Sequence, residues 1–153
     1  MSAALSVLIA EDDSGHATLM LRNLRRAGLF AQVVHLLDGQ ELLDYMYRRD
    51  SWQHRHSHGQ IALLLDLNMP RLGGFEVLRR LKVDKDLARI PVFVLTTTDN
   101  PAEIERCYAL GASACLIKPV DYGAFGEMIQ RLAEFLMVVE MPSETPSGAP
   151  DER

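Results

Sequence analysis

Short apolar runs alternate along the chain with longer segments in which apolar residues recur every three or four positions. The apolar runs span residues 5–10, 29–34, 61–65, 91–95 and 114–117. They are rich in branched side chains and show no polar alternation, so we predict five strands that are buried on both faces. In the segments between these runs, apolar residues recur every three or four positions, which predicts a helix after each strand.

Polar residues and glycines mark the expected helix boundaries. Gly28 and Gly111 are expected to stop the first and fourth helices, and the last helix is expected to reach about Val139. Short polar side chains, which are typical caps, precede four of the helices. These residues are Ser14, Asp38, Asn100 and Asp121.

The alternation of strands and helices predicts a single α/β domain over residues 4–140. Buried parallel strands need helices on both faces, and right-handed crossovers leave few arrangements. We expect a doubly wound, flavodoxin-like (βα)5 sheet with the strand order 2-1-3-4-5. Residues 141–153 are rich in Pro, Ser, Glu and Gly, which predicts a disordered tail.

Composition and charge narrow the class of protein. The 153 residues are 48% apolar and 24% charged, with a formal net charge of −5, which is typical of a soluble globular domain. The acidic balance argues against non-specific nucleic-acid binding, and no apolar run approaches the roughly 20 residues of a membrane span. The first residues include no basic signal region, and only two cysteines occur. We therefore expect a cytoplasmic protein without membrane or nucleic-acid partners.

Polar residues follow the predicted strands at one edge of the sheet. In doubly wound sheets the site lies at the carboxyl ends of the strands, where the strand order reverses. The residues at those ends include Glu11, Asp12, Asp66, Asn68, Thr96 and Lys118. Each of these residue types alone is more common as a turn, cap or solvated residue, but here four strands deliver them to one edge.

The carboxylates of this set predict a cation site. Converging carboxylates repel one another unless a cation or proton intervenes, and oxygen ligands alone suit a hard cation such as Mg²⁺. A phosphoryl group would complete that coordination, with Lys118 and Thr96 holding its remaining oxygens. One of the carboxylates could itself act as the nucleophile in a phosphoryl transfer.

Four segments, taken in order, are similar to the motifs of a known family. They are VLIAEDD (7–13), LLLDLNMPRLGG (63–74), PVFVLTTT (91–98) and GASACLIKPV (111–120). Over about residues 4–140 the chain resembles the receiver (response regulator) domain family. The resemblance implies a signalling protein rather than an enzyme. A receiver of this family takes a phosphoryl group from a histidine kinase onto one of its aspartates.

The resemblance also implies roles for the residues at the strand ends. Asp66 is similar to the aspartate that takes the phosphoryl group. Glu11 and Asp12 match the acidic pair that binds Mg²⁺, and Asn68 would supply a main-chain carbonyl to the metal.

The resemblance also implies roles for three further residues. Thr96 looks like the hydroxyl that moves towards the phosphoryl group, and Lys118 looks like its ion-pair partner. Pro119 matches a proline that usually follows a cis peptide bond in this family.

Two positions depart from the family pattern. Gly73 and Gly74 stand where Asp-Gly is usual, which should affect the loop more than the chemistry. Cys115 replaces the usual Tyr or Phe, and a small thiol cannot report a switch as a large ring does. We therefore expect the output to use the surface of residues 102–115 or a changed dimer.

A narrower resemblance covers the segments DGQELLDYMYRR, VLTTT and EFLMVVEMP, together with the long loop before the third strand. These look like single-domain receivers paired with bacterial phytochrome histidine kinases. This resemblance implies a bacteriophytochrome as the kinase partner. It also implies a homodimer through the last helix and residues 135–141.

The last helix gives an independent reason to expect a contact with a partner. Residues 135–139 are apolar all round, which is more than one buried stripe requires. A helix end folded onto its own domain is the alternative. The stripe expected to face the core consists of Tyr122, Phe125, Ile129, Leu132 and Leu136.

Two other functions stay open at this point. A pseudo-receiver would bind partners without phosphorylation, although the acidic pair with Asp66, Thr96 and Lys118 argues against it. An aspartyl-phosphate phosphohydrolase carries Asp-x-Asp at the strand end, where this chain has Asp66-Leu67-Asn68. The amide of Asn68 cannot act as the general acid that such an enzyme needs.

Overall fold

The computed structural model describes residues 5–29, 31–56 and 59–143 of the chain. Its strands are β1 (Leu5–Ala10), β2 (Gln32–Leu36), β3 (Gln60–Asp66), β4 (Val92–Thr96) and β5 (Ala114–Ile117). Its longer helices are α1 (Ser14–Arg26), α2 (Gly39–Met46), α3 (Gly74–Val83), α4 (Pro101–Ala109) and α5 (Tyr122–Val138). A helix therefore follows each of these strands, as the alternation predicts.

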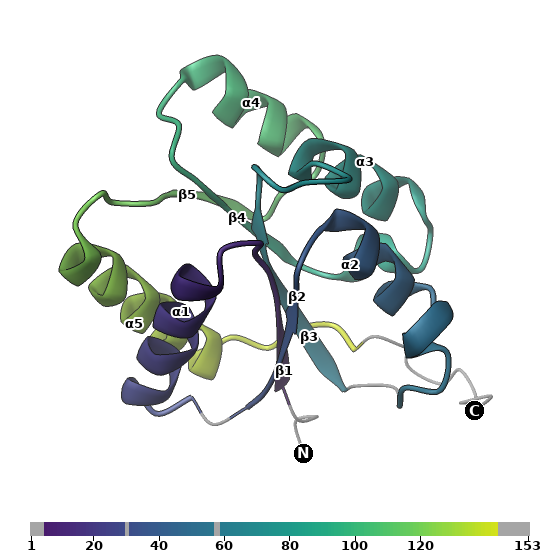
Figure 1. Ribbon diagram of the computed structural model, residues 1–153, viewed down its shortest axis with the longest axis horizontal. Coiled ribbons are helices and arrows are strands. Elements are labelled where there is room, and N and C mark those ends of the chain that lie inside the picture. Colours follow the sequence, from purple (N-terminus) through teal and green to yellow (C-terminus); the bar gives the residue numbers. More distant parts are fainter. Residues whose placement is uncertain (1–4, 30, 57–58, 144–153) are drawn as a thin grey trace.

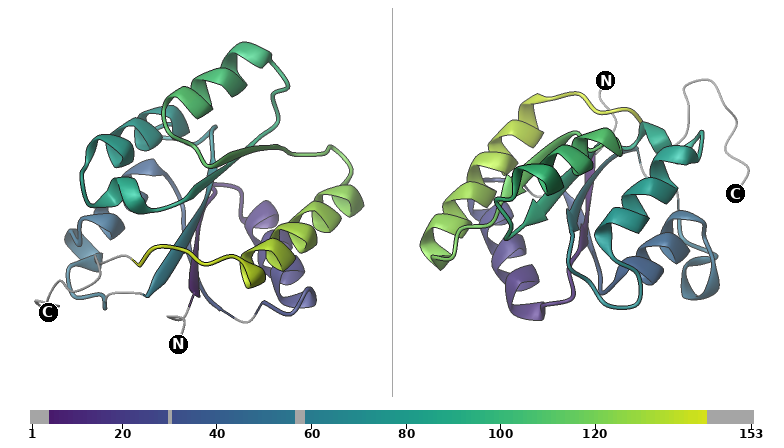
Figure 2. Two further views of the ribbon diagram at one scale, coloured as in Figure 1. Left: turned by 180° about the vertical axis from the view of Figure 1, so that it is seen from behind. Right: turned by 90° about the horizontal axis from the view of Figure 1, so that it is seen from above.

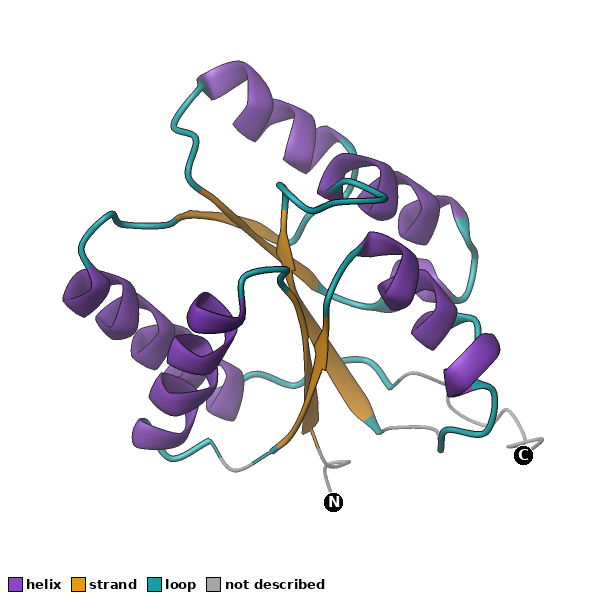
Figure 3. Cartoon of the chain, in the orientation of Figure 1, coloured by secondary structure: helices purple, strands orange, loops and turns teal. Residues whose placement is uncertain are grey.

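The strands form a parallel sheet in the order β2-β1-β3-β4-β5 (Figures 1 and 3). The helices α1 and α5 pack on one face, and α2, α3 and α4 cover the other. All seven residues of β3 are buried between the two layers. These observations confirm the predicted doubly wound, flavodoxin-like class and its strand order.

The register of the two central strands positions the candidate site. Ala10 of β1 lies opposite Leu65 of β3. Glu11 comes directly after β1 and Asp66 is the last residue of β3, so their side chains emerge beside each other at the carboxyl edge. The chain reverses its direction of winding between β1 and β3, which is where ligands bind in sheets of this kind.

The second strand begins three residues later than the predicted 29–34. Gly28 has a φ of 97°, and its N–H donates to Arg25 O, while the N–H of Leu29 donates to Leu24 O. This pair of bonds is a Schellman motif, in which the apolar residue after the glycine packs back on its helix. Leu29 is buried for that reason, and the strand starts only where Gln32 pairs with Ser6.

The helix caps agree with the sequence at three of four positions. The side chains of Asp38, Asn100 and Asp121 accept N–H bonds from the first turns of α2, α4 and α5. The prediction of Ser14 as the cap of α1 is wrong. Asp13 is extended and its Oδ1 accepts the His16 N–H at 3.0 Å, so Ser14 is already helical.

The stripe on α5 is confirmed except at its first position. The side chains that pack in the core are Phe125, Ile129, Leu132 and Leu136. Tyr122, the first residue of α5, is 68% exposed, and its ring meets that of His16 on α1. Phe135 and Val138 are also exposed, at 48% and 81%. Within the described part of the chain, no helix is long and apolar enough to cross a membrane.

The segment after α5 crosses the amino ends of the strands and reaches the start of β3 (Figure 2). Gln60 holds it there: its Nε2 donates to Glu140 Oε2 at 2.9 Å, and its Oε1 accepts the Met141 N–H at 3.0 Å. Ser143 then forms an antiparallel bridge with Gln60. Residues 144–153 of the predicted tail lie outside the described residues, and the domain boundary at residue 140 stays a prediction.

Candidate functional site

The carboxyl edge of the sheet carries a cluster of buried polar side chains. Glu11 follows β1, Asp66 ends β3, Thr96 ends β4 and Lys118 follows β5. Their exposed fractions are 2%, 6%, 1% and 8%, respectively. Buried charges require partners, so the contacts among these four residues determine what the site can bind.

Lys118 crosses the cluster and pairs with both buried acids. Its Nζ donates to Glu11 Oε1 at 2.7 Å and lies 3.7 Å from Asp66 Oδ2. One ammonium group therefore faces two carboxylates, and the cluster keeps an excess of negative charge.

This excess of negative charge, together with burial, shifts the pKa values of the two acids in opposite directions. Burial raises the pKa of Asp66 to about 7, and the neighbouring Glu11 carboxylate adds to the effect while Lys118 opposes it. Burial also raises the pKa of Glu11, but hydrogen bonds from Asp66 and Lys118 outweigh it and hold that pKa below its usual value. Asp66 is therefore the acid that takes up a proton first.

The donor set fits a hard divalent cation. Carboxylate oxygens of Glu11, Asp12 and Asp66 lie within 4.8 Å of one another, and Asp12 is exposed to solvent. With Asp66 ionised, Glu11 Oε2 has no hydrogen-bond partner among the described residues although it is buried. Such an oxygen is costly unless a cation approaches it, and an all-oxygen site suits Mg²⁺ or Mn²⁺.

Asn68 lies beside the acids on the loop that follows β3. Its N–H donates to Asp66 Oδ1 at 3.2 Å. A glycine makes the tight return of this loop possible, because a Cβ on Gly74 would lie 2.6 Å from Leu67 Cα and 2.7 Å from Asp66 O. Gly74, the second glycine of the pair, is therefore the one that the loop requires, and it is also the glycine of the usual Asp-Gly pattern.

Thr96 closes the other side of the cluster. Its hydroxyl oxygen accepts the Thr98 N–H at 3.1 Å, and its carbonyl accepts the Lys118 N–H at 2.7 Å. No peptide bond in the described ranges is cis, so the expected cis bond before Pro119 is wrong. Trans is the lower-energy isomer of a bond to proline, and the β5 backbone here reaches Thr96 without the cis form.

A second hydroxyl, which the sequence reasoning missed, links the cluster to α4. Thr98 Oγ1 donates to Glu103 Oε2 at 2.7 Å and accepts the Asn100 N–H at 3.1 Å. The run of three threonines just before the Asn-Pro helix start was the signal that could have indicated this link.

Comparisons with known proteins agree with this geometry. Residues 7–130 match the model of the response regulator receiver domain. The chain belongs to this family. It is 32% identical to the probable methanogenesis regulatory protein FilR2 of Methanothrix harundinacea, over 84% of this chain and 81% of that protein. It is 30% identical to the response regulator Rcp1 of Synechocystis, over 90% of this chain and 92% of that protein.

Solved structures give the same result for the receiver domain. The receiver domain from Rhodospirillum rubrum is 40% identical with a TM-score of 0.83, covering 93% of this chain and 99% of that one. The Mn²⁺-bound form of Rcp1 is 28% identical with a TM-score of 0.84, covering 90% and 99%. The phosphorylated cyanobacterial phytochrome response regulator RcpA is 29% identical with a TM-score of 0.84, covering 92% and 100%.

Near Cys115 on β5, this receiver domain has the aromatic ring of Tyr108, which comes from α4. Cys115 stands where the family usually has Tyr or Phe, and its N–H donates to the hydroxyl of Tyr108 at 3.1 Å. The Cys115 side chain packs against the core layer that contains the fully buried Cys107. The ring of Tyr108 is thus tied to the backbone of β5 from outside the core.

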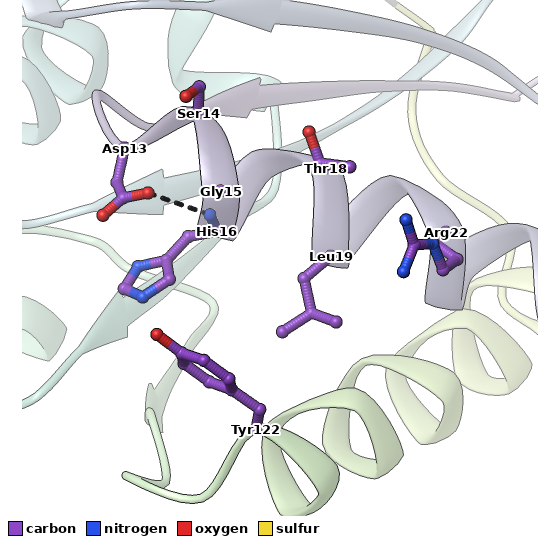
Figure 4. A pocket seen from close by; sticks show the side chains of 8 residues that line it. All are labelled: Asp13, Ser14, Gly15, His16, Thr18, Leu19, Arg22 and Tyr122. Carbon is purple, nitrogen blue, oxygen red and sulfur yellow. Dashed lines mark hydrogen bonds between the residues drawn. The ribbon is translucent and has the colours of Figure 1, made fainter.

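A pocket of about 370 Å³ lies beside the site of this receiver domain, between α1 and the start of α5 (Figure 4). At one end the ring of His16 meets Tyr122 edge-on with centroids 6.3 Å apart, and Arg22 lies at the other end. His16 Nδ1 is 3.5 Å from Glu11 Oε1, which joins the pocket to the acidic cluster. No pattern in the sequence distinguishes His16 from a surface residue.

Proposed function

We propose that this response regulator accepts a phosphoryl group on Asp66 from the phosphohistidine of a histidine kinase, in the cytoplasm. The observation that carries the proposal is the position of the Asp66 carboxylate, which is buried between a second carboxylate and the ammonium group of Lys118. The chain acts as a phosphoryl acceptor in a phosphorelay and not as an enzyme with its own substrate.

In the proposed reaction an oxygen of ionised Asp66 attacks phosphorus while the bond from phosphorus to the donor nitrogen breaks. Lys118 pairs with an oxygen of the transferred group, and the hydroxyl of Thr96 donates to another. Glu11, Asp12, Asp66 and the Asn68 carbonyl would hold Mg²⁺. When bound, Mg²⁺ supplies charge neutralisation at the phosphoryl oxygens.

Metal binding would also change the protonation state of the acceptor, Asp66. Burial raises the pKa of Asp66 to about 7 in the cation-free site, so protonation competes with the reactive, ionised form of the acceptor. A protonated carboxyl is a poor nucleophile. A divalent cation beside Asp66 favours the ionised form, which links metal binding to reactivity.

The proposed kinase partner is a bacteriophytochrome. The support comes from the similarity to RcpA, which is a cyanobacterial phytochrome response regulator, together with the similarity to Rcp1. We further propose a homodimer through the last helix and residues 135–141. Phe135, Met137 and Val138 expose apolar surface there, at 48%, 44% and 81%.

The experiment measures intact mass after incubation with acetyl phosphate, with and without Mg²⁺. The wild type should gain the mass of one phosphoryl group only with Mg²⁺, and Asp66→Asn should gain none. Asp99→Asn is the matched control because Asp99 is an exposed acid of a neighbouring loop, and it should behave as wild type. Failure of the wild type with both acetyl phosphate and an autophosphorylated phytochrome kinase would overturn the proposal in favour of a pseudo-receiver.

A further inference from the structure

The loop that carries Asn68 contains a strained residue at its far end. Arg71 has a φ of 64°, in the left-handed region that residues with a side chain rarely adopt. Such a conformation persists where surrounding contacts hold it in place. The contacts of Arg71 therefore bear on how the loop is positioned.

Arg71 is held by a two-point ion pair with the start of α2. Its Nε donates to Asp38 Oδ2 at 2.8 Å, and its Nη2 donates to Asp38 Oδ1 at 2.9 Å. Asp38 is a rigid anchor because its side chain is only 13% exposed and its Oδ1 also accepts the Glu41 N–H at 2.8 Å. A guanidinium fork and a carboxylate in this geometry fix orientation as well as distance.

The loop is also in backbone contact with α2. A Cβ on Gly39, the first residue of α2, would collide with the carbonyl oxygen of Leu72. At the near end the Leu67 N–H donates to Leu95 O at 3.2 Å. The segment with Asn68 is thus anchored at Leu67 on one side and at Arg71 on the other.

We propose that Arg71 is a positioning residue for metal binding, and that its ion pair with Asp38 holds the Asn68 main chain against the Glu11–Asp12–Asp66 cluster. Breaking the pair frees the loop and lowers the affinity for Mg²⁺. The inference rests on the metal-binding part of the proposed function, but its test does not require phosphorylation.

Removing the Arg71 side chain should change the Mg²⁺ affinity in opposite directions if Arg71 acts by its charge and if it acts by positioning the loop. The two roles can therefore be separated. Removing the positive charge of Arg71 would strengthen Mg²⁺ binding if only long-range electrostatics mattered. Removing the anchor weakens it if positioning matters. Arg71→Lys keeps the charge but loses the fork. Asp38→Asn keeps a good helix cap but loses the ionic partner.

The experiment measures the dissociation constant of Mg²⁺ by isothermal titration calorimetry on the intact chain, with urea unfolding of the same samples. Outer partners that hydrogen-bond a metal ligand directly are worth about 10-fold or more in affinity. Arg71 acts through the loop backbone and its side chain is 60% exposed, so Arg71→Lys, Arg71→Ala and Asp38→Asn should each weaken binding by up to about 10-fold. Arg79→Ala is the matched control, since Arg79 is a half-exposed arginine paired with Glu76 on α3. It should bind Mg²⁺ as wild type does.

The outcomes separate this inference from the proposed function. Unchanged Mg²⁺ affinity in the folded Arg71→Lys and Asp38→Asn variants, or tighter binding in Arg71→Ala, would overturn the positioning role. A lower unfolding free energy with unchanged affinity would show a structural contact only and would overturn it as well. If the wild type binds no Mg²⁺, both proposals fail. If it binds Mg²⁺ but gains no phosphoryl group, only the proposed function fails.

Discussion

The ammonium group of Lys118 lies 2.7 Å from Glu11 Oε1 and 3.7 Å from Asp66 Oδ2, so one buried cation compensates two buried acids. These residues come from three separate strand ends, which the crossovers of the fold bring to one edge. The pairing makes the stability of the domain depend on the same charges that the proposed phosphoryl transfer uses.

Replacing Lys118 should therefore destabilise the protein. Lys118→Met leaves Glu11 and Asp66 without their cation, and breaking a buried pair in this way costs about 3 kcal/mol or more of unfolding free energy. Urea unfolding at neutral pH measures the loss. Added Mg²⁺ should restore part of it by occupying the same acids. A stability equal to that of wild type in metal-free buffer would contradict this account.

The raised pKa of Asp66 predicts that its own contribution to metal-free stability falls as pH rises. Between about pH 4 and pH 7 the folded state holds a proton on Asp66 that the unfolded chain has lost, so the Asp66 contribution to the unfolding free energy decreases across this range. Asp66→Asn has no such proton and should lack this part of the slope. Urea titrations at several pH values with a chelator test it, and parallel slopes in both proteins would refute it.

The two glycines before α3 should respond differently to alanine. A Cβ on Gly74 meets backbone atoms of Leu67 and Asp66, whereas a Cβ on Gly73 meets only Leu67 O at 3.8 Å. Gly74→Ala must move the loop and should cost about 2 kcal/mol of unfolding free energy. Gly73 is the N-cap of α3, where Ala is less favourable than Gly, so Gly73→Ala should cost about 1 kcal/mol or less. Thermal or urea unfolding compares this matched pair, and equal losses would contradict the close approach.

The proposed dimer predicts a specific effect of charge at the end of α5. Val138→Glu places a carboxylate on the apolar surface of α5 and should convert a dimer to a monomer in sedimentation velocity. Val83→Glu is the control, because Val83 is similarly exposed, at 71% against 81%, but lies on α3. A wild type that sediments as a monomer at high concentration would remove the dimer proposal.

The apolar pattern predicted the parts of the fold that depend on burial. The strands β1 and β5 have the predicted bounds, and the acidic residues at the strand ends meet because parallel strands end at one edge. The errors lie where local bonds compete with hydrophobicity. Leu29 is apolar and branched, yet the glycine turn before it returns it to α1. Tyr122 fits the α5 stripe by spacing, but the spacing does not show that this first residue of the helix is exposed.

Other features of the site depend on contacts that no local pattern contains. The pair of Arg71 with Asp38 joins residues 33 positions apart, and the bond between Tyr108 and the Cys115 backbone joins a helix to a strand across a turn. The left-handed conformation of Arg71 is equally invisible, because arginine gives no local signal for it. The resemblance to the family supplied roles but not these supports.

The hold of Gln60 on the segment after α5 has a consequence for the folding kinetics. Its bonds to Glu140 and Met141 close loops of 80 and 81 residues. Closing such long loops costs chain entropy, so we expect these contacts to form late in folding. Interactions that are absent from the folding transition state act on the unfolding rate. Weakening this contact should therefore shorten the lifetime of the folded domain while leaving its refolding rate nearly unchanged.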